Sequence, residues 1–152
     1  MKRSNQGRPT TLSIPHMANA GQPSSIGAYP AAGPYGLVFN DNNSKLEFTG
    51  TNATTDRGFH LYRTGRFIMT ETNALVTMGD CVMDADTLNI NGTNGGDARL
   101  ILDDVTVNNS NFRIYTGQGM SGYGRGNLTM NSVTGTDRNL DFHPAANTEI
   151  HI

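Results

Sequence analysis

The sequence predicts an all-β protein, built as a short right-handed parallel β-helix with three strands per coil and four to five coils. Three observations predict it. Gly, Asn and Thr are frequent and punctuate the chain as turn residues do. Apolar residues occur in pairs at positions x and x+2, which is typical of short half-buried strands. These pairs recur in three interleaved series with a period of about 25 residues, as expected for stacked coils.

Each series supplies one strand to every coil, and successive coils would stack about 4.8 Å apart. Polar corners would separate the strands, and the Gly-rich stretch from Thr116 to Gly126 would leave one corner as a loop. An antiparallel β-sandwich or jelly roll is the alternative fold, because it is also built from short strands and polar turns. The predicted strand starts are Leu37, Phe67, Leu88, Phe112 and Leu140 in the first series, Leu46, Leu75, Leu100, Leu128 and Ile150 in the second, and Phe59, Val82, Val105 and Val133 in the third.

Composition argues against several classes of protein. The 152 residues suit one domain, and the net charge of −2 disfavours a nucleic-acid-binding protein. No apolar run approaches the length of a membrane span, and residues after Lys2 lack the apolar core of a secretory signal. The single cysteine, Cys81, forms no intrachain disulfide. Asp84 and Asp86 alternate as calcium ligands can, but no calcium-loop pattern surrounds them, so we predict neither metal nor cofactor.

Residues 1–35 differ from the remainder of the chain, because five of the six prolines fall there. Proline fixes φ and removes a backbone donor, so we predict an extended Pro/Gly-rich arm over 1–35 and a β-solenoid domain over 36–152. Such an arm gains order only on its own domain or on a neighbouring chain. The candidate partner-binding residues of the arm are its basic, aliphatic and aromatic side chains, Arg3, Arg8, Leu12, Ile14, Ile26, Tyr29 and Tyr35.

The last five residues, TEIHI, alternate apolar and polar side chains up to Ile152. A solenoid has an unpaired strand edge at each end, and such edges associate unless they are covered. A second copy of the chain, another protein or the folded-back arm could cover this one. We therefore predict that Ile150 and Ile152 take part in self-association.

Adjacent acidic residues, Asp103 and Asp104, follow the apolar stretch Leu100–Leu102. With the stretch FRIY at Phe112–Tyr115, this part of the chain resembles β-helical polysaccharide-cleaving enzymes such as pectinases, which have an Asp-Asp corner and an Arg-Ile-Lys motif. Tyr115 stands where their lysine would be, and their Asn-Thr-Asp and Gly-His-Gly motifs are missing. Adjacent strand residues face opposite sides, so the two carboxylates need a bend to converge. The residues predicted to contact a glycan are Asp103, Asp104, Arg113, Tyr123 and Arg125.

The layout as a whole, a Pro-rich arm leading into a short β-solenoid, resembles virion accessory proteins of tailed phages. That group includes capsid-decorating cement proteins, head fibres and small spike subunits. The resemblance implies a non-enzymatic protein that staples neighbouring capsid or tail subunits, assembles as a homotrimer and resides in a virion assembled in the host cytoplasm. A host surface glycan is a further candidate partner. The alternatives are a carbohydrate-binding or carbohydrate-cleaving module, and an extracellular bacterial adhesin or fibre subunit at the cell surface.

Overall fold

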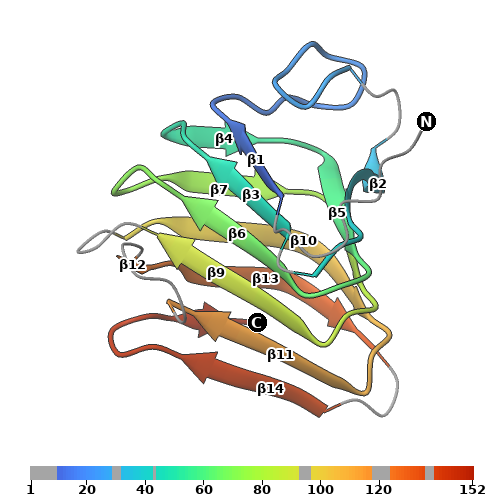
Figure 1. Ribbon diagram of the computed structural model, residues 1–152, viewed down its shortest axis with the longest axis vertical. Coiled ribbons are helices and arrows are strands. Elements are labelled where there is room, and N and C mark those ends of the chain that lie inside the picture. The colour runs from blue at the N-terminus through green and yellow to red at the C-terminus, as the bar shows by residue number, and fades with distance from the viewer. Residues whose placement is uncertain (1–9, 29–31, 43, 93–96, 118–123, 136–138) are drawn as a thin grey trace.

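The computed structural model shows one stack of parallel β-strands wound into coils, with a segment from near the N-terminus looped above the first coil (Figure 1). It describes residues 10–28, 32–42, 44–92, 97–117, 124–135 and 139–152. These residues contain no helix, and therefore none long and apolar enough to cross a membrane. The all-β prediction is confirmed, and the parallel pairing rules out the antiparallel sandwich.

The strands form two sheets, and neighbours within each are separated in the chain by other strands. Sheet 1 contains, in spatial order, β1 (Thr11–Ile14), β3 (Ser44–Phe48), β6 (Gly65–Met69), β9 (Thr87–Gly92), β11 (Asn111–Thr116) and β14 (Asn139–Pro144), with β12 (Gly124–Arg125) beside β9. Sheet 2 contains β2 (Gly33–Phe39), β5 (Arg57–Leu61), β8 (Cys81–Met83), β4 (Asn52–Thr54), β7 (Leu75–Met78), β10 (Arg99–Val107), β13 (Asn127–Thr134) and β15 (Ile150–His151).

The coils follow from the pairing of the long strand β10. Its first half pairs with β7 and its second half with β8, so sheet 2 provides two walls of each coil and sheet 1 the third. The described strands thus make four complete coils, β3-β4-β5, β6-β7-β8, β9-β10 and β11-β13, flanked by the partial coils β1-β2 and β14-β15. Adjacent coils approach closely at Gly58, where an added Cβ would lie 1.6 Å from the carbonyl oxygen of Asp80, so a larger residue could not fit.

The core is a continuous apolar column inside the stack. Aromatic side chains from successive coils are fully buried in it, including Phe48, Phe59, Phe67 and Phe112. Full burial of such a side chain contributes about 1.5–3 kcal/mol, so the column is the main source of stability. Burial also raises the pKa of Cys81 to about 12, and this thiol therefore packs as a small uncharged group.

The structure corrects the predicted register at its start. Leu37 pairs with Phe59, which the sequence analysis placed in the third series, and Leu46 pairs with Phe67 of the first. From Phe59 onward the assignment to series agrees with the sheets, and pairs such as Phe112 with Leu140 and Leu100 with Leu128 are in register. The difference arises at β4, a three-residue strand between Leu46 and Phe59. Its one buried residue, Ala53, has no apolar residue two positions away, so the pattern of apolar pairs passes over this strand.

Part of the segment predicted as an arm contacts the solenoid directly. Strand β1 pairs in parallel with β3, and residues 15–28 form the loop above the first coil in Figure 1. Ile14 and Met17 are buried in the core cluster. The guanidinium of wholly buried Arg57 donates to the carbonyl oxygens of Gly27 at 2.8 Å and Ile26 at 3.3 Å, so hydrogen bonds from a side chain of the stack hold the backbone of this loop.

Candidate functional site

The structure separates the residues predicted to contact a glycan. Asp103 and Asp104 both face solvent, because β10 bends between its two halves and turns two consecutive side chains outward. Asp103 accepts a hydrogen bond from Asn131 at 3.3 Å. Arg113 projects instead from β11 in sheet 1, with its Nε 4.0 Å from an oxygen of Asp141. The bend that the two adjacent acids need is present, but these acids and Arg113 belong to different sheets.

The other two predicted glycan contacts lie near the Gly-rich insertion. Tyr123 falls outside the described residues, and Arg125 is exposed on β12, which pairs with β9 in antiparallel orientation. The end of the insertion therefore turns back along sheet 1. Asn91, opposite Arg125 in this pairing, is fully buried.

The predicted partner-binding residues have different environments. Leu12 is 47% exposed on the edge strand β1, whereas Ile14 is 1% exposed and faces the chain's own core. Ile26 is partly buried against that core. Arg3, Arg8 and Tyr29 lie outside the described residues, as does the side chain of Tyr35 on β2. Ile14 therefore stabilises this fold, and among the predicted partner-binding residues whose side chains are described, Leu12 is the exposed one.

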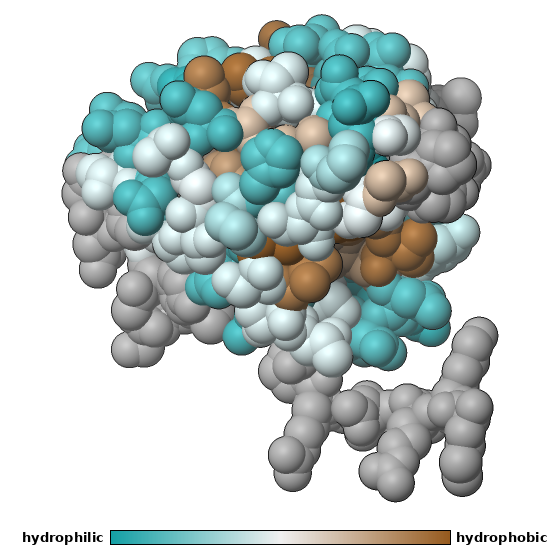
Figure 2. All heavy atoms as spheres, turned by 90° about the horizontal axis from the view of Figure 1, so that it is seen from above, coloured by the Kyte–Doolittle hydropathy of each residue, from teal (hydrophilic) through white to brown (hydrophobic). Residues whose placement is uncertain are grey.

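Apolar surface is present at both ends of the stack. Leu12 and Val38 are exposed beside an open hollow of about 160 Å³ near the first coil, and apolar side chains show among polar ones when the molecule is seen from that end (Figure 2). At the other end, Ile150 pairs with Leu128 and is partly buried, whereas Ile152 is 68% exposed. Thus the two residues predicted to self-associate differ, and Ile152 is the accessible one.

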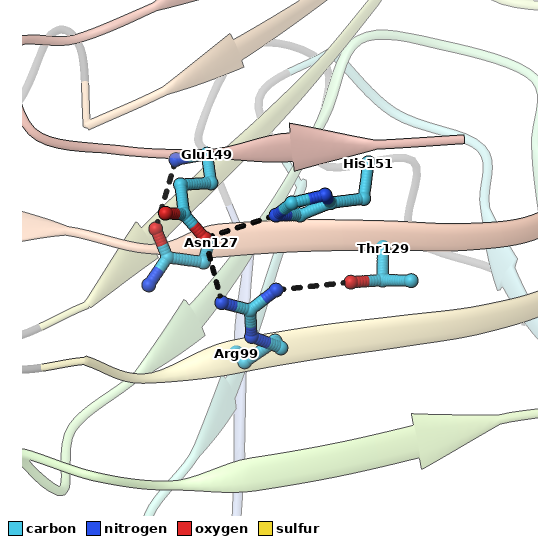
Figure 3. Close-up of polar contacts among 5 residues, drawn as sticks. All are labelled: Arg99, Asn127, Thr129, Glu149 and His151. Carbon is cyan, nitrogen blue, oxygen red and sulfur yellow. Dashed lines mark hydrogen bonds and ion pairs between the residues drawn. The ribbon is translucent and has the colours of Figure 1, made fainter.

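A polar cluster connects three strands near the C-terminus (Figure 3). Arg99 on β10 donates to Glu149 at 3.0 Å and to Thr129 on β13 at 3.2 Å, and His151 lies 2.9 Å from the same Glu149 oxygen. The hydrogen bonds from His151 and Arg99 lower the pKa of Glu149. Because Asn127 also accepts from the Glu149 backbone at 3.0 Å, the cluster attaches the last strand to the stack.

A second polar cluster lies at the corner where each coil passes from sheet 2 into sheet 1. The turns after β5, β8 and β10 stack there and border an open groove of about 280 Å³. We call it the corner groove. Its lining combines an aromatic ring, a guanidinium, carboxylates and amides, from Asn42, Tyr62, Arg63, Thr64, Asp84, Ala85, Asp86 and Asn109.

Hydrogen bonds between successive coils fix the acidic side of the corner groove. Asp84 accepts from Asn108 at 2.8 Å and lies 2.6 Å from the Nε2 atom of His60, and Asp86 accepts from Asn109 at 2.8 Å. Desolvation alone would raise the pKa of Asp84, but the hydrogen bonds from Asn108 and His60 outweigh it and lower that pKa. Asp84 therefore stays ionised in mildly acidic solution.

Sequence reasoning considered Asp84 and Asp86 only as metal ligands and missed their neighbours. Within the described part of the chain, no group of three or more His, Cys, Asp and Glu side chains is arranged to hold a metal ion. The sequence did contain a signal for this groove in its spacing. Tyr62, Asp86 and Asn109 follow the stacked strands β5, β8 and β10, at intervals close to the coil period.

Comparisons with known proteins find that this chain is similar to part of an adhesin. In an alignment of 140 positions that covers 86% of this chain, it is 34% identical to the adhesin BmaC autotransporter of Brucella suis biovar 1 (strain 1330). The chain spans 4% of the length of that protein. No protein-family model matches the chain, and no solved structure matches it. The similarity is therefore to a short piece of a much longer adhesin.

Proposed function

We propose that this chain is a non-enzymatic structural segment of a surface adhesin or fibre. The observation that carries the proposal is the similarity to an autotransporter adhesin along 86% of the chain. The coil stack supports it, because a solenoid grows by adding coils and presents long polar sides to its surroundings. In this role the chain is extracellular or exposed on the cell surface.

A structural role also fits the separation of the acidic and basic residues. Glycoside hydrolysis requires two carboxyl groups that face each other across one bond, about 5–10 Å apart. Asp103 and Asp104 are neighbours on one bend that both point to solvent, and Arg113 stands on the other sheet. This arrangement favours contact surfaces over a cleavage site, and we propose that the chain has no catalytic activity.

The virion role is the second form of the proposal. In it, Leu12 on β1 and the residues before it would contact capsid or tail subunits, and the solenoid would associate as a homotrimer. The edge strand β1 favours this form, since it offers the exposed side chain of Leu12 and, among the described strands, pairs with β3 alone. Ile14 and Ile26 would contribute only indirectly, by holding β1 and the following loop on the stack.

Antibodies against the folded chain distinguish these settings. If the chain belongs to an adhesin, they should label intact cells of the organism that encodes it, and protease added outside the cells should remove the label. Labelling of purified virus particles instead would support the virion form. Labelling only after the cells are permeabilised, with none on particles, would contradict both.

A further inference from the structure

The corner groove contains an aromatic ring held in a fixed orientation. Tyr62 is 44% exposed, and one face of its ring stacks on His60, with the ring centroids 3.8 Å apart and the planes inclined by 21°. His60 is itself buried and lies 2.6 Å from Asp84. Because this contact fixes the tyrosine before any ligand arrives, binding on its open face costs little side-chain entropy.

Hydrogen-bonding groups from the neighbouring coil line the groove beside the ring. Asp84 and Asp86 are oriented by Asn108 and Asn109 from the next coil, and each ionised carboxylate still has lone pairs available for further donors. Arg63 is exposed at the rim and carries several N–H donors. The groove thus presents an apolar face together with acceptors and donors, which is the combination that a sugar ring with its C–H face and hydroxyl groups requires.

Size and charge narrow the class of ligand. A hollow of about 280 Å³ lies just below the usual range for small-molecule sites, which suits one or two sugar rings. Two carboxylates against one guanidinium leave the lining negative, so it disfavours acidic sugars and phosphate groups. Apart from the tyrosine ring and Ala85 the lining is polar, which disfavours a lipid.

We propose that the corner groove binds a neutral saccharide unit of a glycan, with Tyr62 as the stacking platform and Asp84, Asp86 and Arg63 as hydrogen-bonding partners of its hydroxyl groups. This site lies apart from the glycan contacts predicted at Asp103, Asp104 and Arg113. The proposal deepens the surface role and rests on it for its biological setting, although binding itself can be measured on the isolated chain.

The chain provides a matched control in a second Tyr–His–Asp stack. Tyr115 stacks on His143 with centroids 4.5 Å apart and planes inclined by 15°, and His143 lies 2.9 Å from Asp141. These residues project from β11 and β14 of sheet 1, on the side of the strands rather than at the stacked corners. The second stack has the same residue types but does not line the corner groove, so it tests whether a tyrosine stacked on a histidine is enough for binding.

The experiment is ligand-observed NMR on the full chain with methyl glycosides of glucose, galactose, mannose and N-acetylglucosamine, and with methyl sialoside as the acidic comparison. At least one neutral glycoside should show saturable binding. Tyr62→Ala should weaken it by at least about tenfold, whereas Tyr62→Phe should retain it and Tyr115→Ala should leave it unchanged. Asp86→Asn should also weaken binding, and because Asp86 is exposed this variant should keep its fold.

Circular dichroism and the thermal midpoint check that each variant is folded. The proposal is overturned if no neutral glycoside binds, if the sialoside binds best, or if Tyr115→Ala weakens binding as much as Tyr62→Ala. If antibodies label the cell surface but no glycoside binds, only the proposal of glycan binding is wrong. If a glycoside binds but antibodies label neither cells nor particles, the glycan-binding proposal stands and the proposed surface function is wrong.

Discussion

Arg57 and Arg99 each join an outlying segment to the coil stack, but one guanidinium is buried and the other faces water. Arg57 is fully buried and binds uncharged acceptors in the loop 15–28, the carbonyl oxygens of Gly27 and Ile26. Arg99 has a side chain that is 30% exposed, and it pairs with Glu149, which is 61% exposed. The N-terminal loop is thus held by hydrogen bonds from a buried guanidinium, and the C-terminal strand by a surface ion pair.

The difference matters because solvent decides what each contact contributes. An exposed ion pair typically adds no more than about 1 kcal/mol and is screened by salt. A hydrogen bond from a charged donor contributes about 1.5–3 kcal/mol, and salt screens it less when the donor is buried, as Arg57 is. We therefore expect the N-terminal attachment to be strong and insensitive to salt, and the C-terminal attachment to be weak and dependent on pH.

The largest effect is expected for Arg57→Ala. The substitution leaves two carbonyl groups without their donor and a cavity where the side chain packed, so the free energy of unfolding should fall by about 3 kcal/mol or more. Urea denaturation followed by circular dichroism measures it. Arg113→Ala, at an exposed arginine of sheet 1, is the matched control and should change little. A loss below about 1 kcal/mol for Arg57→Ala would show that the buried bonds do not hold the loop.

A smaller effect is expected at Gly27, which presents its carbonyl oxygen to Arg57 with φ at +78°. An added Cβ meets no atom within 4 Å, so Gly27→Ala tests backbone conformation alone. It should lower the free energy of unfolding by about 1–2 kcal/mol, the usual cost of this conformation for residues other than glycine. Gly27→Asn should cost less, because asparagine tolerates that region. Equal losses for the two variants would argue against the backbone explanation.

The smallest effect is expected at the C-terminal cluster, where Glu149→Gln should destabilise less than Gly27→Ala does. Because its pKa is lowered in the folded chain, ionised Glu149 stabilises the fold above its unfolded pKa, and the contribution is lost as the pH falls through the folded pKa. The difference between wild type and Glu149→Gln should therefore be present at pH 7, decline once the pH falls below the ordinary glutamate pKa of 4.5, and vanish below the lowered pKa of the folded chain. A difference that does not decline below pH 4.5 would contradict the assignment.

Much of the coil stack could be predicted, because inward residues must be apolar and the coil period brings them back at regular intervals. The register of Leu37 and Leu46 could not, since it depends on β4, whose buried Ala53 has no apolar residue two positions away. The role of Arg57 was also beyond the sequence, because its acceptors are backbone carbonyls about 30 positions away. The corner groove was missed for a similar reason: apolar periodicity does not reveal the stacking of Tyr62 on His60.

Hydrogen exchange on the full chain, read by mass spectrometry, tests most directly whether the N-terminal loop is an integral part of the fold. In wild type, the backbone amides of Ala20 and Ser25, which donate to Asp56 and to the carbonyl of His16, should exchange slowly, and more slowly than His151 on the terminal strand. In Arg57→Ala the loop amides should lose most of their protection while those of β6 and β9 keep more of theirs. Loop amides that exchange at the rate of an unfolded peptide in wild type would contradict this assignment.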